Sequence, residues 1–127
     1  MSGLGEIRQF NVLNGEAPDV RRTPYGPVGT MVDDHGVEVV WVVKQDEAID
    51  PEWYSQEQLD VLYVVRGMLR IEFADDVSAT RTLKEGDLLA IPPGTRCRAY
   101  RWPRESHGPA IFLAITPDQA PDGRSAG

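Results

Sequence analysis

Hydrophobic and polar positions alternate with a period of two in several short stretches of the chain. In the clearest, every second residue from Leu69 to Phe73 is apolar, and Arg70 and Glu72 lie between them. Successive side chains of a β-strand point to opposite faces, so this pattern predicts a strand with one buried face. Arg70 and Glu72 are expected to point outward, toward solvent or a subunit contact.

The remaining apolar stretches are also short, and turn-forming residues separate them. The stretch 37–44 is almost continuously apolar, which is typical of a central strand covered on both faces. The run 88–91 ends at Pro92 and Pro93, which cannot donate to a strand ladder. Many short strands divided by turns predict an all-β sandwich or barrel. Strands are expected at 28–32, 37–44, 61–65, 69–73, 79–83, 88–91, 96–102 and 110–115.

The two ends of the chain differ from the strand-rich middle. Residues 14–27 are rich in Gly, Pro, Asp and Arg and predict a loop, while residues 6–13 predict an entry strand or arm. The last residues are small, polar and rich in Pro and Gly, which is typical of disorder. The predicted organisation is an N-terminal arm and loop over 1–27, a barrel over 28–116 and a disordered tail over 117–127.

Composition narrows the classes of function. The chain has 127 residues, about one domain, and a formal net charge of −7, which disfavours binding to a nucleic-acid backbone. A single cysteine, Cys97, cannot form an internal disulfide and suits a reducing compartment. No basic region followed by an apolar run opens the sequence, and no apolar run approaches the ~20 residues of a membrane span. A cytoplasmic protein without nucleic-acid or membrane partners is expected.

Two motifs resemble those of the cupin family. Residues 60–67 (Asp-Val-Leu-Tyr-Val-Val-Arg-Gly) are similar to the end of its first motif, and Gly86, Pro92 and Gly94 match the spacing of its second motif. The resemblance covers roughly residues 37–116. It implies a cupin-type double-stranded β-helix, which is a jelly-roll β-barrel, and pairing into a homodimer. Cupins include enzymes, sensors and storage proteins, so the resemblance does not select a function.

The resemblance also places the family's metal-binding histidines, and this chain has none of them. The histidine of the second motif would fall at position 97, which is Cys97. The first histidine pair would fall on Tyr54 and Gln56, or on Trp53 and Ser55. Amide and phenol groups are poor ligands for zinc or iron, so no metal and no other cofactor is expected.

A ligand cavity is expected inside the barrel. If Asp60 points inward, Gln56 and Gln58 share its orientation, and an inward Cys97 brings Arg101 with it. Aromatic residues are expected near the mouth. The candidate ligand-binding residues are Trp41, Tyr54, Gln56, Gln58, Asp60, Cys97 and Arg101.

Most of these residues also have a purely structural interpretation. Cys97 is either a small buried hydrophobe or a thiolate nucleophile. Asp60 is either an acid or base, or the buried partner of Arg101. Trp41 is either part of the core or a platform for a ligand.

Three functions therefore remain open. The first is a metal-free barrel that binds a small organic molecule without turnover. The second is a metal-independent isomerase or cyclase that uses Asp60 with Tyr54 or Cys97. The third is a barrel filled by its own side chains that acts through its surface.

Overall fold

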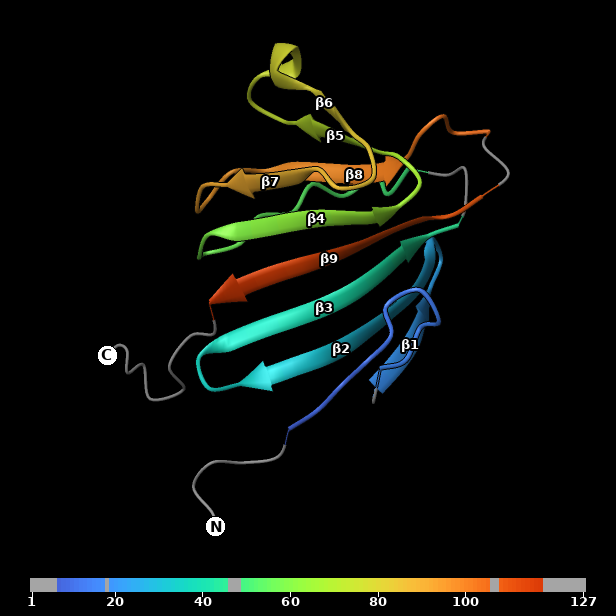
Figure 1. Ribbon diagram of the computed structural model, residues 1–127. Coiled ribbons are helices and arrows are strands. Elements are labelled where there is room, and N and C mark those ends of the chain that lie inside the picture. Colours follow the sequence, from blue (N-terminus) through green and yellow to red (C-terminus); the bar gives the residue numbers. More distant parts are fainter. Residues whose placement is uncertain (1–6, 18, 46–48, 106–107, 118–127) are drawn as a thin grey trace.

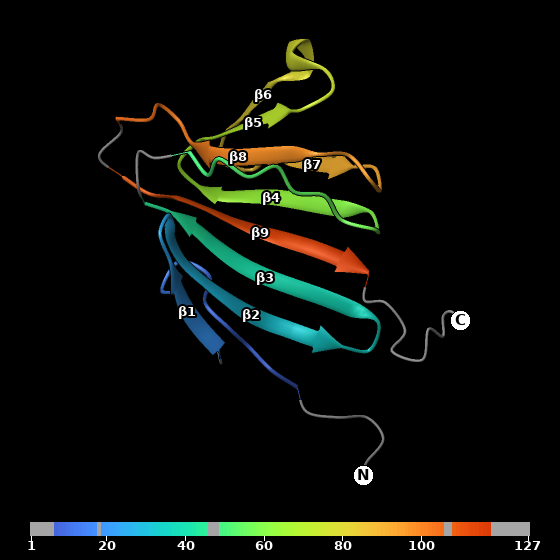
Figure 2. The same cartoon turned by 180° about the vertical axis from the view of Figure 1, so that it is seen from behind.

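A computed structural model describes residues 7–17, 19–45, 49–105 and 108–117, which form two antiparallel β-sheets (Figures 1 and 2). The larger sheet has the strand order β1-β2-β3-β9-β4-β7, and the smaller has the order β6-β5-β8. This architecture confirms the all-β prediction. The strands are β1 Asp19–Thr23, β2 Gly26–Asp34, β3 Val37–Lys44, β4 Asp60–Arg66, β5 Leu69–Phe73, β6 Arg81–Leu83, β7 Leu88–Ile91, β8 Cys97–Arg101 and β9 Ala110–Pro117, with a 3₁₀ turn, η1, at Val77–Ala79.

The main core lies between the two sheets. Leu62 of the larger sheet and Leu69 and Ile71 of the smaller are fully buried there. Arg70 and Glu72, which alternate with them, lie on the opposite face of β5, as the period-two pattern predicts. Burial of these apolar side chains, at roughly 25 cal/mol per Å², holds the two sheets together.

A second core lies on the other face of the larger sheet. Trp41 and Val43 of β3 pack there with Met31 and Ile111, and the N-terminal arm covers them. The indole Nε1 of Trp41 donates a 2.7 Å hydrogen bond to the carbonyl of Val12 in that arm. This double coverage explains why the sequence of β3 is almost continuously apolar.

Two sequence-based predictions of secondary structure are wrong in detail. Residues 14–27 are not all loop, because β1 pairs with β2 at the edge of the larger sheet. Its charged and exposed residues made it resemble a loop, but charge is usual on an edge strand. The strand expected at 79–83 is only β6, because Asp76 caps the preceding turn η1 by accepting from the backbone amide of Ser78.

The turns that follow the two motifs are as the sequence predicts. Gly67 follows β4 with a φ of +79°, and a Cβ there would lie 2.6 Å from the carbonyl oxygen of Pro109. Gly94 follows β7 with a φ of +80°. Residues 1–6 and 118–127 lie outside the described residues, so the predicted tail stays a prediction. Within the described ranges, no helix is long and apolar enough to cross a membrane.

Candidate functional site

Three neighbouring strands, β3, β9 and β4, form the wall on which the candidate site is built (Figure 1). In the register of these strands, Glu38 lies opposite Thr116, and Ala114 lies opposite both Val40 and Leu62. Continuing the β4–β9 register by one more pair brings the first residue of β4 to the level of Thr116. Glu38, Thr116 and Asp60 therefore form one polar row across three strands at the end of the wall.

A cavity of about 220 Å³ opens in front of this wall. This volume lies below the ~300–1,000 Å³ typical of sites for drug-sized ligands, so the cavity suits a smaller molecule. The cavity is lined by Glu38, Val40, Val42, Lys44, Tyr54, Gln56, Asp60, Leu62, Phe112, Ala114 and Thr116.

Asp60 is the most unusual of the lining residues. Only 4% of its surface is exposed, and its Oδ1 atom is buried without a hydrogen-bond partner among the described residues. Burial disfavours the charged form and raises the pKa of this carboxyl group to about 6. A buried polar atom without a partner costs roughly 1–3 kcal/mol. Asp60 therefore places an incompletely bonded carboxyl group in the lining of the cavity, although Oδ1 itself is closed to solvent, and this group can change its protonation near neutral pH.

Tyr54 and Cys97 lie together beside Asp60. Their backbones exchange two hydrogen bonds, of 3.0 and 2.8 Å, in an isolated bridge between the loop and β8. Although 38% of Tyr54 is exposed, burial of its hydroxyl raises its pKa, and nearby Cys97 and Asp60 raise it further. Burial also raises the pKa of the Cys97 thiol, against the opposing effect of a hydrogen bond from the Tyr54 hydroxyl. Both groups are thus protonated at neutral pH.

The two glutamines lie at the polar end of the cavity. Gln56 lines the cavity and also an adjoining vestibule of about 290 Å³, whereas Gln58 lines only the vestibule. The vestibule and the cavity share Glu38, Gln56 and Thr116. The vestibule is lined by Glu38, Ser55, Gln56, Glu57, Gln58, Thr116 and Pro117.

Besides Gln58, three candidate residues do not line the cavity, and one of them, Cys97, is packed in the main core with 1% of its surface exposed. Trp41 belongs to the second core, because odd-numbered residues of β3 face the arm while even-numbered residues face the cavity. Arg101 is at the far end of β8, about 13 Å from Cys97 at ~3.3 Å per residue, and its Nε donates to the carbonyl of Arg104. Neither lines the cavity, and Arg101 is not the partner of Asp60.

Glu38 and Lys44 were missed by the sequence analysis, although both line the cavity. They are the even-numbered polar ends of β3, and the alternation along this strand was the signal that could have revealed them. Burial lowers the pKa of Lys44, against the opposing effect of Asp50, and its ammonium lies 5.6 Å from the ring centroid of Tyr25. Thr116 donates a long 3.5 Å hydrogen bond to Glu38.

The residues at the family's histidine positions do not suit a metal of the zinc or iron type. Tyr54 and Gln56 do line the cavity, whereas Trp53 points away, with its ring 4.2 Å from the Arg98 guanidinium carbon. A protonated phenol, an amide and a protonated thiol are weak ligands. No group of three or more His, Cys, Asp or Glu residues in the described part of the chain could hold a metal ion.

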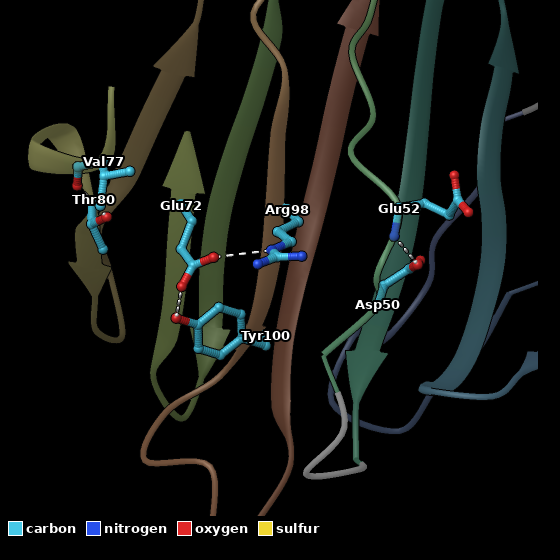
Figure 3. A network of polar contacts seen from close by, with 7 residues as sticks. All are labelled: Asp50, Glu52, Glu72, Val77, Thr80, Arg98 and Tyr100. Atoms are coloured by element: carbon cyan, nitrogen blue, oxygen red, sulfur yellow. Dashed lines mark hydrogen bonds and ion pairs between the residues drawn. The ribbon is translucent and has the colours of Figure 1, made fainter. Parts of the chain in front are cut away.

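The outward face of the smaller sheet carries a different polar cluster (Figure 3). Glu72 accepts hydrogen bonds from the Tyr100 hydroxyl at 2.7 Å and from the Arg98 Nε at 2.9 Å. These two bonds hold the pKa of Glu72 below its usual value, and the bond from Tyr100 has the larger effect. The guanidinium of Arg70 lies 3.8 Å from the ring centroid of Trp102. The cluster satisfies its own polar groups, as a structural network does.

Comparison with known proteins gives matches at the level of structure. No protein-family model and no curated protein matches the chain. A Ralstonia eutropha protein provisionally assigned as a mannose-6-phosphate isomerase is 24% identical, with a TM-score of 0.66 over 88% of this chain and 99% of that one. KdgF from a Halomonas species is 19% identical, with a TM-score of 0.64 over 82% and 89%. An RmlC-like cupin with a double-stranded β-helix from Methanocaldococcus jannaschii is 13% identical, with a TM-score of 0.65 over 92% and 94%.

Proposed function

Since the chain has the double-stranded β-helix fold of the cupin superfamily, we propose that it binds a small organic molecule in the cavity beside β3, β9 and β4. The observation that carries the proposal is the buried carboxylate of Asp60, which lines that cavity and whose Oδ1 has no hydrogen-bond partner among the described residues. A bound molecule that pairs with this carboxylate from the cavity side offsets part of the cost of burying it. Apolar side chains of Val40, Leu62 and Phe112 hold the rest of the molecule.

The test is a fragment screen read by NMR, with variants that change the cavity. We expect hits to shift resonances of the cavity wall and to raise the melting temperature. Ala114→Leu fills the cavity and abolishes these effects, whereas Ala90→Leu, at an exposed position of β7 outside the cavity, retains them. Hits that bind equally well to wild type and to Ala114→Leu contradict the proposed site.

A second candidate function is proton transfer without a metal, as in an isomerase. The observation in its favour is the pKa of Asp60, about 6, close to the pH at which a cell operates. Asp60 then moves the proton, while Tyr54, which lines the cavity in its protonated form, can donate to a developing oxyanion. Cys97 does not line the cavity, so the structure gives it no such part. Exchange of substrate hydrogen for deuterium in D₂O tests it: Asp60→Asn lowers the exchange rate by ~10²–10⁴-fold if Asp60 is the base.

The proposal includes a metal-free site and a paired assembly. Elemental analysis of protein purified without chelator or metal-affinity tag is expected to show no stoichiometric transition metal; one equivalent that Asp60→Asn removes contradicts this. Light scattering is expected to show a homodimer, because β1 and β7 end the larger sheet with open edges. A mass of one chain at micromolar concentration contradicts the dimer.

A further inference from the structure

The charge of the site is concentrated at one end. The vestibule is lined by two carboxylates, two amides, two hydroxyls and Pro117, and no lysine or arginine lines it within the described residues. Glu38 belongs to both the vestibule and the cavity. A molecule that enters past these groups meets hydrogen-bond acceptors and negative charge. Anionic molecules are disfavoured there by repulsion.

Asp60 lies at the inner side of this acidic end, in the same row as Glu38 and Thr116. Neighbouring strands are ~4.8 Å apart, so the backbones of Glu38 and Asp60 are roughly 10 Å apart across β9. Asp60 is buried and its Oδ1 lacks a partner. A buried carboxylate is normally paired with a cation or with several donors. A group on a ligand in the cavity that Asp60 lines would supply a partner for this carboxylate.

Lys44 does not fill that role. It lies six residues from Glu38 along β3, about 20 Å at ~3.3 Å per residue, at the opposite end of the cavity. Its ammonium lies over the Tyr25 ring and in the field of Asp50. Lys44 therefore has interaction partners within the chain, whereas Asp60, at the other end of the cavity, lacks a hydrogen-bond partner for Oδ1 among the described residues.

We propose that the ligand is a small cationic amine, a primary ammonium on an apolar body, whose ammonium pairs with Asp60 and Glu38. This inference rests on the proposed function and specifies the class of ligand. The apolar body packs on Val40, Leu62 and Ala114, which lie next to the polar row in the same wall. The net charge of −7 attracts such a cation from solution.

Three molecules of similar size and different charge test the proposal: benzylamine, benzyl alcohol and benzoate. Each is titrated into the full chain at pH 8, and the dissociation constant is read from NMR shifts. Hydrogen bonds to charged groups are stronger than neutral ones, so benzylamine is expected to bind on the order of tenfold more tightly than the other two. Asp60→Asn is expected to abolish this preference, and Glu38→Gln to reduce it several-fold. Glu52→Gln, which makes the same charge change at an exposed position outside the cavity, is expected to leave it unchanged.

The pH dependence provides a second measurement. Tyr54, Cys97, Glu38 and Lys44 are the other titratable groups around Asp60. The pKa of Asp60 is about 6, so benzylamine affinity is expected to fall ~tenfold between pH 7 and pH 5, as Asp60 takes up a proton. In Asp60→Asn this dependence disappears.

The possible results separate the class of ligand from the presence of a binding site. Tightest binding of benzoate, or equal binding of all three, overturns the cationic preference but leaves the cavity as a binding site. Preference for benzylamine that survives in Asp60→Asn also overturns the assignment, since surface charge then accounts for it. If none of the three molecules binds to wild type, while neutral fragments still shift NMR resonances of the cavity wall, the amine is rejected and the proposed function is retained. If no fragment binds at all, both the amine and the proposed binding site are rejected.

Discussion

Asp60 and Glu72 are both carboxylates on strands of the same barrel, and they have opposite surroundings. Glu72, on the outward face, accepts from Tyr100 and Arg98, and its pKa is lowered. Asp60, on the inward face, has no partner for Oδ1, and its pKa is raised to about 6. Glu72 contributes to stability as an ion, whereas Asp60 opposes stability when ionised. The fold explains a partnered carboxylate, whereas an unpartnered one is the kind of group for which the proposed ligand site gives a reason.

The largest expected effect is on the pH dependence of stability, through Asp60→Asn. The pKa of Asp60 is about 6 in the native state and 3.8 in the reference state, so the native state binds more protons between these values. Stability due to Asp60 is therefore full below pH 4 and is lost as pH rises through 6. At 1.36 kcal/mol per unit, the loss is about 2–3 kcal/mol by pH 8. Urea unfolding from pH 4 to pH 8 should show Asp60→Asn gaining that much relative to wild type.

Other carboxylates also titrate in this range, so the difference between wild type and Asp60→Asn is the quantity to compare. A difference that stays constant from pH 4 to pH 8 would show that Asp60 is solvated or paired in solution.

Cys97 sharpens the comparison, because it adjoins Asp60 but is packed in the main core with 1% exposure. Cys97→Ser is expected to lower the free energy of unfolding by about 1–3 kcal/mol, since the serine hydroxyl would be buried without a hydrogen-bond partner. In the native state a thiol reagent should label Cys97 far more slowly than in denaturant. Rapid native labelling at neutral pH, with an unchanged melting temperature for Cys97→Ser, would instead support a reactive nucleophile.

Glu72→Gln tests the second of the two carboxylates compared above. The variant weakens two charge-assisted bonds on a partly exposed face, so the expected loss at pH 7 is about 1 kcal/mol. The sign is opposite to that of Asp60: stability due to Glu72 is present above its reference pKa and is lost as pH falls through the lowered value. A double-mutant cycle with Arg98→Gln measures the coupling. A coupling energy of zero would mean that the ion pair contributes nothing.

The smallest expected effect is from Trp53→Ala. The Arg98 guanidinium carbon lies 4.2 Å from the centroid of the Trp53 ring at the surface, and an exposed contact of this type contributes about 0.5–1 kcal/mol. Because Trp53 points away from the cavity, ligand binding is expected to be unchanged. A large loss of binding in this variant would place Trp53 at the site and contradict its position in the structure.

Local patterns in the sequence were enough to predict the fold class. Alternation in 69–73 separates inward Ile71 from outward Glu72, and the prolines after Ile91 end β7 as expected. Gly67 turns the chain where the first motif predicts it. These features depend on residues that are close in the sequence, and strand periodicity and turn conformation are local properties.

The composition of the candidate site, unlike the fold class, depends on contacts between strands that are distant in the sequence. Tyr54, Gln56 and Asp60 line the cavity, and their spacing fixes their phase along one segment of the chain. Trp41 was misplaced because both faces of β3 are covered, and only the packed arm shows which face is which. The alternation along β3 places Glu38 on the face opposite to Trp41, and the packed arm shows that this face is the one toward the cavity.

The sequence by itself determined which residues alternate, where the chain turns and that histidine is absent from the expected ligand positions. Only the tertiary structure decided which groups meet. Pairing of β3 and β4 with β9 sets Glu38 and Asp60 in one row, and the course of β8 carries Arg101 away from Asp60. The physical reason is that burial and missing partners, which raise the pKa of Asp60, are properties of the assembled interior and not of the residue.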